Sequence, residues 1–286
     1  MDKLKNNRAA SFIVVTFVYI LATVVGIAVY LTLPYHFALS LLIADVVATA
    51  LTFVFSLIFA NASVYDPYWS VQPPVIITAF AIKHGVNVLG IALLIAVWLW
   101  AVRLTANWAY TFKNLNHQDW RYTMLSEKTG AFYPIINLVG IHLVPTLVVY
   151  ACILPVVYAI SLGFTAHPIS FALCALAALS ATMQGVADIQ MHKFRKKKTG
   201  GFIRVGLWKY SRHPNYLGEI LVWWFIGLAV VVASPDHYWL LFGAVANTLL
   251  FLCVSIPMAD KRQSRKDGWG DYKRQTRMLL PLYKKQ

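Results

Sequence analysis

Long, uniformly apolar stretches alternate with short polar segments along this 286-residue chain. The apolar stretches cover about 10–33, 38–60, 86–104, 133–160, 166–186, 218–233 and 238–257, with a shorter one at 72–82. A helix needs about 20 apolar residues to span a bilayer, and lipid satisfies no backbone group of a non-helical segment. The pattern therefore predicts an all-α polytopic membrane helix bundle, a single integral membrane domain over residues 1–286. We expect about eight transmembrane helices, or seven if 72–82 is re-entrant.

The charge distribution predicts how these helices are oriented. Of the 25 lysines and arginines, eight lie in 193–212 without an acid, and nine lie in 258–286 against three aspartates. Basic loops usually stay in the cytoplasm. Both segments, the 105–131 loop and the N-terminus are therefore predicted to be cytoplasmic. Counting 72–82 as a crossing gives eight crossings and places every basic segment on that side.

Composition limits the partners of the protein. With 59% hydrophobic and 13% charged residues, the chain is unlike an ordinary soluble domain. Cations beside membrane helices usually meet lipid headgroups, so we expect membrane lipids and no nucleic acid as partners. Cys152, Cys174 and Cys253 lie inside apolar runs without the spacing of metal ligands, and no metal is expected. The sequence does not indicate an oligomeric state.

Acidic residues in or beside apolar runs are candidate functional groups. An ionised side chain in a membrane costs about 2.5–3.5 kcal/mol on insertion scales and usually faces the interior of the bundle. Four of the eleven acids lie in such positions, namely Asp45, Asp66, Asp188 and Glu219. Asp45 can simply pair with a neighbouring side chain, whereas the other three belong to longer polar patterns.

One pattern ends the apolar run at 166–186. On a continuing helix, Gln184, Asp188, His192 and Arg195 occupy one face. An acid followed two turns later by an arginine can hold a sugar hydroxyl and a phosphate side by side. The alternative is an ion pair at the end of the helix.

A second pattern, GLWKYSRHPNYLGE at 206–219, carries polar residues into the start of an apolar helix. Pro214 suits the first helical turn, which stacks Asn215 and Glu219 one turn apart. An amide and a carboxylate together complement a carboxamide, and Arg212 at the helix start favours an anion. Alternatively, Glu219 forms an ion pair with a neighbouring arginine.

Between these two patterns lie Arg204 and the KTGG stretch at 198–201. Cations around a turn that glycine permits suit a diphosphate group. No G-x-G-x-x-G follows a strand, so the pattern excludes a Rossmann domain. A nucleotide would therefore have to be bound by the membrane bundle and its cytosolic loops.

The segment GLWKYSRHPNYLGE resembles the C-terminal signature of the membrane steroid 5α-reductase superfamily, including its bacterial members and the related sterol C14 and C24 reductases. Two further stretches, GWGDYKRQTRMLLPLY at 268–283 and QGVADIQMHKFR at 184–195, are also similar to this superfamily. The resemblance covers about 180–286. Isoprenylcysteine carboxyl methyltransferases share the R-H-P-x-Y-x-G core more distantly. The extended HPNYLGE, with Asp188 and Arg195 upstream, favours the reductases.

The resemblance implies that 180–286 forms the cofactor-binding part of a membrane reductase that takes NADPH from the cytosolic side. The residues implied in cofactor binding are Gln184, Asp188, Arg195, Arg204, Arg212, Asn215 and Glu219. Of these, Asn215 and Glu219 would hold the nicotinamide carboxamide. Burial would keep the reactive ring beside an apolar substrate and away from water.

The substrate half of the resemblance departs from the family. In steroid 5α-reductases, a glutamate before a proline-containing turn works with a later tyrosine to polarise an enone carbonyl. In YDPYWSVQP, Asp66 stands at the glutamate position, and Trp100 falls where the tyrosine would be. Arg103, three residues on, matches a family arginine, and both Trp100 and Arg103 are expected to bind the substrate.

An indole cannot polarise a carbonyl as a phenol does, so another acid is needed. We expect Asp66, held protonated by burial, and Tyr68 to be catalytic. Tyr65 and Tyr110 are alternatives. Asp66 could instead cap the helix that follows it, and Arg103 could snorkel to the interface.

The sequence thus favours an NADPH-dependent oxidoreductase, similar to 3-oxo-5α-steroid 4-dehydrogenases, that reduces an activated C=C bond of a lipophilic steroid-like or enone lipid. The main alternative is a membrane methyltransferase that uses S-adenosylmethionine on a lipid or a prenylated group. A lipid-binding or transport protein without a nucleotide is a third. The resemblance to bacterial members of the family favours a bacterial inner membrane.

Overall fold

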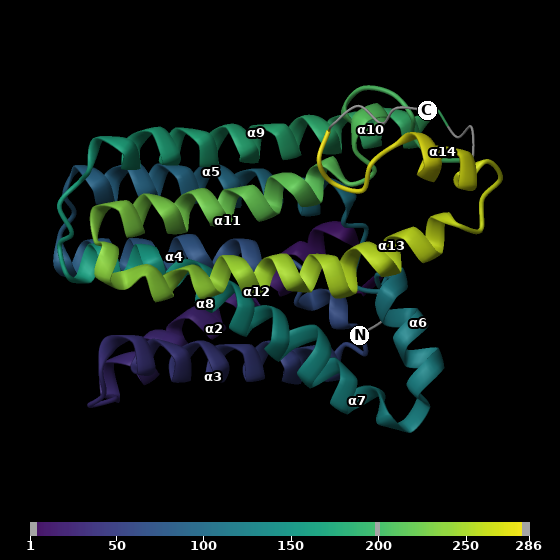
Figure 1. Ribbon diagram of the computed structural model, residues 1–286. Helices are drawn as coiled ribbons and strands as arrows, with labels where there is room; N and C mark the ends of the chain where they lie inside the picture. The colour runs from purple at the N-terminus through teal and green to yellow at the C-terminus, as the bar shows by residue number, and fades with distance from the viewer. Residues whose placement is uncertain (1–4, 198–200, 282–286) are drawn as a thin grey trace. The chain divides into compact units, whose positions relative to one another are not determined.

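The computed structural model describes residues 5–197 and 201–281, and the regular secondary structure of these residues is entirely helical (Figure 1). The prediction of an all-α polytopic bundle is confirmed. Seven segments of the described chain are long and apolar enough to span a membrane. They are Arg8–Thr32, Phe37–Ile58, Val88–Thr111, Trp120–Ser161, Pro168–Lys196, Pro214–Ala233 and Pro235–Gln263.

The short run at 72–82 lies in helix α4 (Tyr68–His84), which has 17 residues and contains Pro73 and Pro74. At a rise of about 1.5 Å per residue, this helix is about 26 Å long, a little less than the ~30 Å hydrocarbon core. It is not one of the seven segments. An eighth crossing, the cytoplasmic location of the basic loops and the inner membrane therefore stay predictions.

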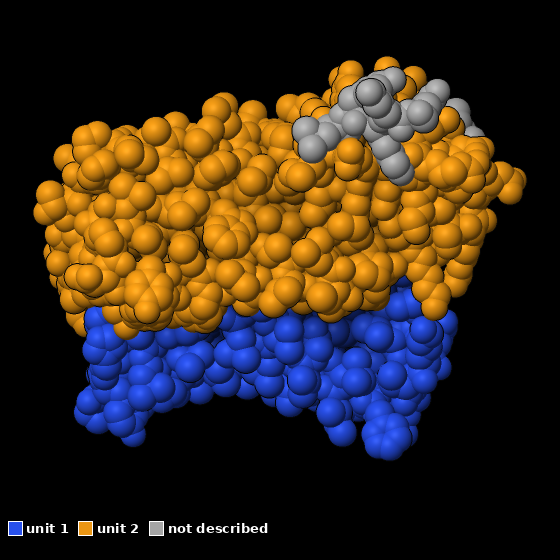
Figure 2. Space-filling model, viewed as in Figure 1, with its two compact units in different colours: residues 1–76, 108–150 blue, residues 77–107, 151–286 orange. Residues whose placement is uncertain are grey.

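The chain divides into two compact units, coloured separately in Figure 2. Unit 1 comprises 1–76 and 108–150, and unit 2 comprises 77–107 and 151–286. The predicted cofactor-binding part, 180–286, falls within unit 2. Three helices pass from one unit to the other, namely α4, α5 (Val88–Thr111) and α8 (Val144–Ser161).

The remaining elements of unit 1 are α2 (Arg8–Thr32), α3 (Phe37–Ile58), η1 (Ala62–Val64), α6 (Trp120–Thr129), η2 (Gly130–Phe132), α7 (Tyr133–Ile136) and the π-helix η3 (Asn137–Leu143). Short polar side chains cap the N-termini of several of these helices. The side chain of Asn7 accepts a hydrogen bond from the backbone N–H of Ala10, and Asp119 accepts one from Arg121. Such caps satisfy backbone donors that a helix start leaves unpaired.

The remaining elements of unit 2 are α9 (Pro168–Lys196), α10 (Leu207–Tyr210), α11 (Pro214–Ala233), η4 (Pro235–Leu241), α12 (Phe242–Leu250), the π-helix η5 (Phe251–Ser255), α13 (Ile256–Gln263) and α14 (Trp269–Gln275). Helices α9 and α11 run antiparallel along most of their lengths (Figure 1). Gly218 permits this approach, because a Cβ there would lie 2.4 Å from Cγ of Gln184. At Gly243, a Cβ would lie 2.3 Å from the carbonyl oxygen of Ala151, so α12 packs directly on α8.

The C-terminal segment is tied to the start of α11. The backbone N–H of Arg212 donates to the carbonyl of Arg277 at 2.9 Å, and its Nη1 donates to the carbonyl of Thr276 at 2.7 Å. The Tyr272 hydroxyl on α14 donates to the carbonyl of Trp208 on α10. These contacts hold α10 and α14 together at one end of α9 and α11 (Figure 1).

Candidate functional site

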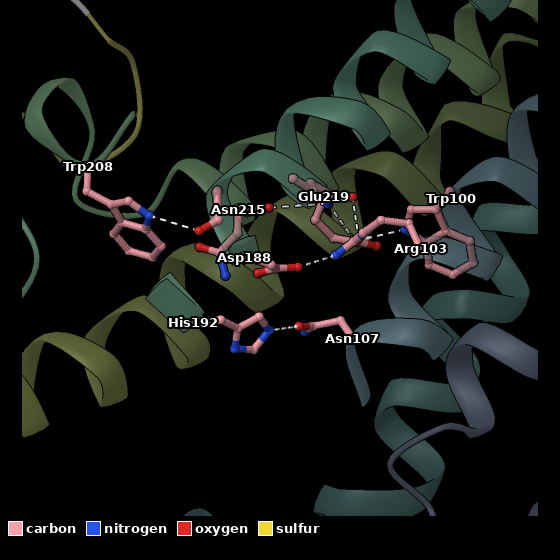
Figure 3. A network of polar contacts seen from close by, with 10 residues as sticks. Trp100, Arg103, Asn107, Asp188, His192, Trp208, Asn215 and Glu219 are labelled. Carbon is pink, nitrogen blue, oxygen red and sulfur yellow. Dashed lines mark hydrogen bonds and ion pairs between the residues drawn. The ribbon is translucent and has the colours of Figure 1, made fainter. Parts of the chain in front are cut away.

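Unit 2 contains a network of polar side chains from α5, α9 and α11, centred on Arg103 (Figure 3). Nη1 of Arg103 lies 2.9 Å from Oδ2 of Asp188, and Nη2 lies 3.5 Å from Oε2 of Glu219. Nη2 also donates a hydrogen bond to Oε1 of Gln184. One guanidinium group therefore joins three helices that are far apart in the sequence.

The Glu219 carboxylate is the most heavily bonded group of the network. Its Oε2 accepts hydrogen bonds from Nε1 of Trp100 and Nε2 of Gln184, both at 2.8 Å. Its Oε1 accepts from Nε1 of Trp223 at 3.0 Å. The two indole rings meet edge to face, with centroids 4.8 Å apart. The carboxylate is thus fixed by three N–H donors as well as by Arg103.

Helical spacing explains how the sequence assembles this network. Trp100 and Arg103 are three residues apart on α5, and Gln184 and Asp188 are four apart on α9, so each pair shares a face. Glu219 lies four residues after Asn215, beyond Pro214 at the first position of α11. Small residues open the space between helices. At Gly185, a Cβ would lie only 3.3 Å from Cγ of Arg103.

The network is largely buried and carries an excess of negative charge. The side chains of Arg103, Asp188 and Glu219 are 16%, 13% and 13% exposed. One guanidinium faces two carboxylates, so the ion-paired groups sum to one negative charge. Nε of Arg103 and Oδ1 of Asn215 are buried without a hydrogen-bond partner among the described residues. The arrangement therefore suits a ligand of positive net charge that supplies one acceptor and one donor.

The sequence predicted most of this network and missed part of it. The structure brings together six residues that the sequence singled out, namely Trp100, Arg103, Gln184, Asp188, Asn215 and Glu219. Asn215 joins the network through its backbone carbonyl, which accepts a hydrogen bond from Gln184 at 3.2 Å. The sequence missed Trp223, which follows Glu219 by four residues. Beside the network, Oδ1 of Asn107 lies 2.7 Å from Nε2 of His192 (Figure 3).

Three of the predicted cofactor-binding arginines have other neighbours. Arg195 is exposed near the end of α9. Arg204 donates to the carbonyl of Gly268 at 2.7 Å and lies over the Phe202 ring, 4.7 Å from its centroid. Residues 198–200 of the KTGG stretch lie outside the described residues. The described contacts of Arg204 are therefore with Gly268 and Phe202 and do not reach the Arg103 network.

The third arginine, Arg212, belongs to a separate cluster. Its Nη2 lies 3.2 Å from Oδ2 of Asp260 on α13, and Nε2 of His213 lies 2.8 Å from Oδ1 of the same carboxylate. Asp260 is not among the acids that the sequence analysis singled out. The feature of the sequence that could have pointed to Asp260 is its position at the start of a basic segment. Arg212 is thus held by Asp260 and the C-terminal segment.

The predicted catalytic residues Asp66 and Tyr68 lie in unit 1 and have different partners. The Tyr122 hydroxyl donates to Oδ1 of Asp66 at 2.6 Å, and the Tyr68 hydroxyl donates to Oδ1 of Asp45 at 2.7 Å. Burial raises the pKa of Asp66 to about 6, against the opposing effect of the nearby Arg121 guanidinium. The catalytic roles of Asp66 and Tyr68 stay predictions.

The fold and the network define a polytopic helical membrane protein with a buried ionic site. Residues 52–276 match a family described as a protein of unknown function, DUF1295, and the chain belongs to this family. Methanethiol S-methyltransferase 1 of Bradyrhizobium diazoefficiens is 35% identical over 98 residues, which are 34% of this chain and 32% of that protein. The chain thus matches about a third of the length of this relative. No solved structure matches the chain.

These comparisons correct the predicted activity. They fit the broader membrane superfamily that contains both reductases and methyltransferases, and they do not show the narrower steroid-reductase specificity. The prediction of an NADPH-dependent reductase of enone lipids is wrong, because the named relative is a methyltransferase. The prediction of NADPH as cofactor is wrong for the same reason. The R-H-P-x-Y-x-G core occurs in both kinds of enzyme, and the resemblance places Trp100 where the tyrosine of carbonyl reduction would stand.

Proposed function

We propose that the protein is a membrane methyltransferase that uses S-adenosylmethionine and methylates a small lipophilic acceptor. The observation that carries this proposal is the similarity to a protein named methanethiol S-methyltransferase. A small thiol is accordingly the first acceptor to test. Because the shared segment is about a third of each chain, the acceptor is tested separately from the cofactor.

The charge of the Arg103 network supports this cofactor. S-adenosylmethionine carries a sulfonium cation, an ammonium and a carboxylate, which give it a net positive charge at neutral pH. The network has an excess of one negative charge from Asp188 and Glu219 over Arg103. A dinucleotide with several phosphate groups would add negative charge to this excess. In a buried site, that difference in sign has a large effect on affinity.

Individual groups of the network fit the parts of this cofactor. The partnerless Oδ1 of Asn215, together with the Glu219 carboxylate, would accept hydrogen bonds from the ammonium. The partnerless Nε of Arg103 would donate to the carboxylate. The indoles of Trp100 and Trp223 would hold the Glu219 carboxylate in position for the contact with the ammonium.

When bound, S-adenosylmethionine supplies an electrophilic methyl group. The protein residues would then position the cofactor and keep water away from it. The buried side chains of Trp100, Gln184 and Trp223 leave little room for water around Glu219. A lipophilic acceptor would already be concentrated in the bilayer, so a site inside a helical bundle suits it.

Cofactor binding to the detergent-purified protein tests the proposal. We expect S-adenosylmethionine and S-adenosylhomocysteine to raise the midpoint of thermal unfolding, because ligands of the folded state stabilise it. NADPH should leave it unchanged. Radiolabelled methyl should pass from S-adenosylmethionine to methanethiol or ethanethiol. A protein that gains no stability from either adenosyl compound would refute the cofactor, whereas binding without transfer would refute only the acceptor.

The Glu219→Gln variant tests the site. Losing a charge-assisted hydrogen bond of about 1.5–3 kcal/mol should weaken S-adenosylmethionine binding about 10- to 100-fold. Glu127→Gln is the matched control, because Glu127 is exposed and lies outside the network. Equal affinities for the two variants would mean that Glu219 has a purely structural role.

A further inference from the structure

Unit 1 contains a second polar region that the proposed function does not use. Four residues of α3, Asp45, Thr49, Thr52 and Ser56, recur at helical spacing and are at most 3% exposed. Polar groups inside a membrane bundle are costly to bury unless they have partners. The partners of this face therefore indicate what the region does.

Hydroxyl groups satisfy most of this buried face. The Thr49 and Thr146 hydroxyls lie 2.9 Å apart, and that of Thr146 lies 2.7 Å from the Tyr65 hydroxyl. At the other end, the Tyr68 hydroxyl donates to Asp45 at 2.7 Å. These groups can act as donor and acceptor at once, so they satisfy one another.

One ring nitrogen of His142, Nε2, lacks a hydrogen-bond partner among the described residues. His142 lies in the π-helix η3 and is fully buried. Its Nδ1 lies 3.0 Å from the carbonyl oxygen of Asn137. A carbonyl oxygen can only accept, so Nδ1 carries the proton, and in the neutral ring Nε2 keeps a free lone pair.

A second unsatisfied acceptor belongs to the same π-helix. Nδ2 of Asn137 donates to the Ser56 hydroxyl at 3.0 Å, while its Oδ1 is buried without a partner among the described residues. Both His142 and Asn137 point toward α3, because the imidazole also packs against the Phe53 ring at 5.5 Å. The Tyr65 ring lies on the imidazole at 4.5 Å. Nε2 of His142 is thus an unpaired acceptor on a ring that packs against aromatic side chains, and Oδ1 of Asn137 is a second unpaired acceptor of the same π-helix.

From this geometry we propose that unit 1 binds a small neutral thiol or alcohol at His142. The S–H or O–H group has a single proton and donates it to Nε2 of His142. The apolar part of the ligand packs against the rings of Phe53 and Tyr65. Leaving a buried acceptor unpaired costs about 1–3 kcal/mol, so a protic ligand is favoured at this position. The proposal does not depend on methyl transfer or on the network in unit 2.

The test is ¹⁵N NMR of the full-length protein labelled at histidine and reconstituted in lipid. The His142 side chain should give one protonated and one non-protonated ring nitrogen. Ethanethiol and ethanol, added separately, should each be tested for a saturable shift of the non-protonated signal. A shift with either compound supports the proposal, and comparison of the two identifies the preferred donor. The absence of a saturable shift with both would mean that only water occupies the position, which overturns the proposal.

Variants make the test specific. His142→Phe should remove the responding signal and so assign it. Should His142→Phe fail to fold, His142→Gln provides the assignment. A saturable shift that persists in the His142 variant, and so belongs to another histidine, contradicts the site.

Discussion

The indole Nε1 of Trp100 donates a hydrogen bond of 2.8 Å to Oε2 of Glu219, which lies 119 positions later in the chain. The indole is fully buried, so this bond is protected from competition by water. It gives Trp100 a structural role: it holds the carboxylate that the proposed cofactor would meet. A tyrosine at this position would present a hydroxyl that can both donate and accept, whereas an indole can only donate.

Trp100→Phe should weaken the site while preserving most of the aromatic packing. Removing one donor to a carboxylate should destabilise the protein by about 1.5–3 kcal/mol and lower S-adenosylmethionine affinity. The matched control is Trp98→Phe on the same helix, since the Trp98 indole is 42% exposed and donates to Thr78. Thermal unfolding with and without the cofactor measures both effects. Equal losses for the two variants would contradict the role of Trp100.

Arg103→Met should be among the most damaging substitutions in unit 2. It leaves the Asp188 and Glu219 carboxylates buried without their counter-ion, a change that typically costs about 3–5 kcal/mol. Adding Asp188→Asn should recover part of this loss by removing one uncompensated charge. A double-mutant cycle on thermal stability measures the coupling. Strictly additive effects would show that the two groups do not interact.

Gly218→Ala should force α9 and α11 apart. The new Cβ would lie 2.4 Å from Cγ of Gln184 and 2.9 Å from the carbonyl oxygen of Ser180, and the backbone oxygen cannot move aside easily. Overpacking of this kind costs about 1–3 kcal/mol. Gly270→Ala is the control, because the nearest atom there is the end of the Arg274 side chain at 3.9 Å. Unfolding in detergent should separate the two variants, and a neutral Gly218→Ala would mean that the helices pack less closely.

Asp66 should make stability depend on pH. An unfolded aspartate has a pKa of about 3.9, whereas burial raises that of Asp66 to about 6. Between these values the folded protein binds more protons than the unfolded chain. Its stability should therefore decrease as pH rises from about 4 to 6, by at most about 3 kcal/mol, and the cost persists above pH 6.

The Asp66→Asn variant isolates this contribution. As pH rises from 4 to 7, the unfolding temperature of the wild type should fall relative to that of Asp66→Asn. The control is Asp267→Asn, because Asp267 is exposed and its removal should leave the profile parallel to wild type. A difference between wild type and Asp66→Asn that is independent of pH would place the pKa near its ordinary value.

Apolar run length and helical periodicity predicted the helices and much of the site. Both depend on residues close together in the chain. A run of about 20 apolar residues has no other stable form in lipid, so the spans followed from the sequence. Spacings of three and four residues placed Gln184 with Asp188, and Asn215 with Glu219, on shared faces. The resemblance pointed to the positions of Trp100 and Arg103.

The tertiary structure decided which of these faces meet and what charge they form together. Nothing local indicates that Arg103 pairs with both Asp188 and Glu219, or that Arg212 pairs with Asp260 instead, because these partners lie on different helices. The signature motif was equally unable to separate a reductase from a methyltransferase. By itself the sequence determined the helices and their polar faces. Only helix packing decided which polar groups share a buried site, and so the sign of the charge offered to a ligand.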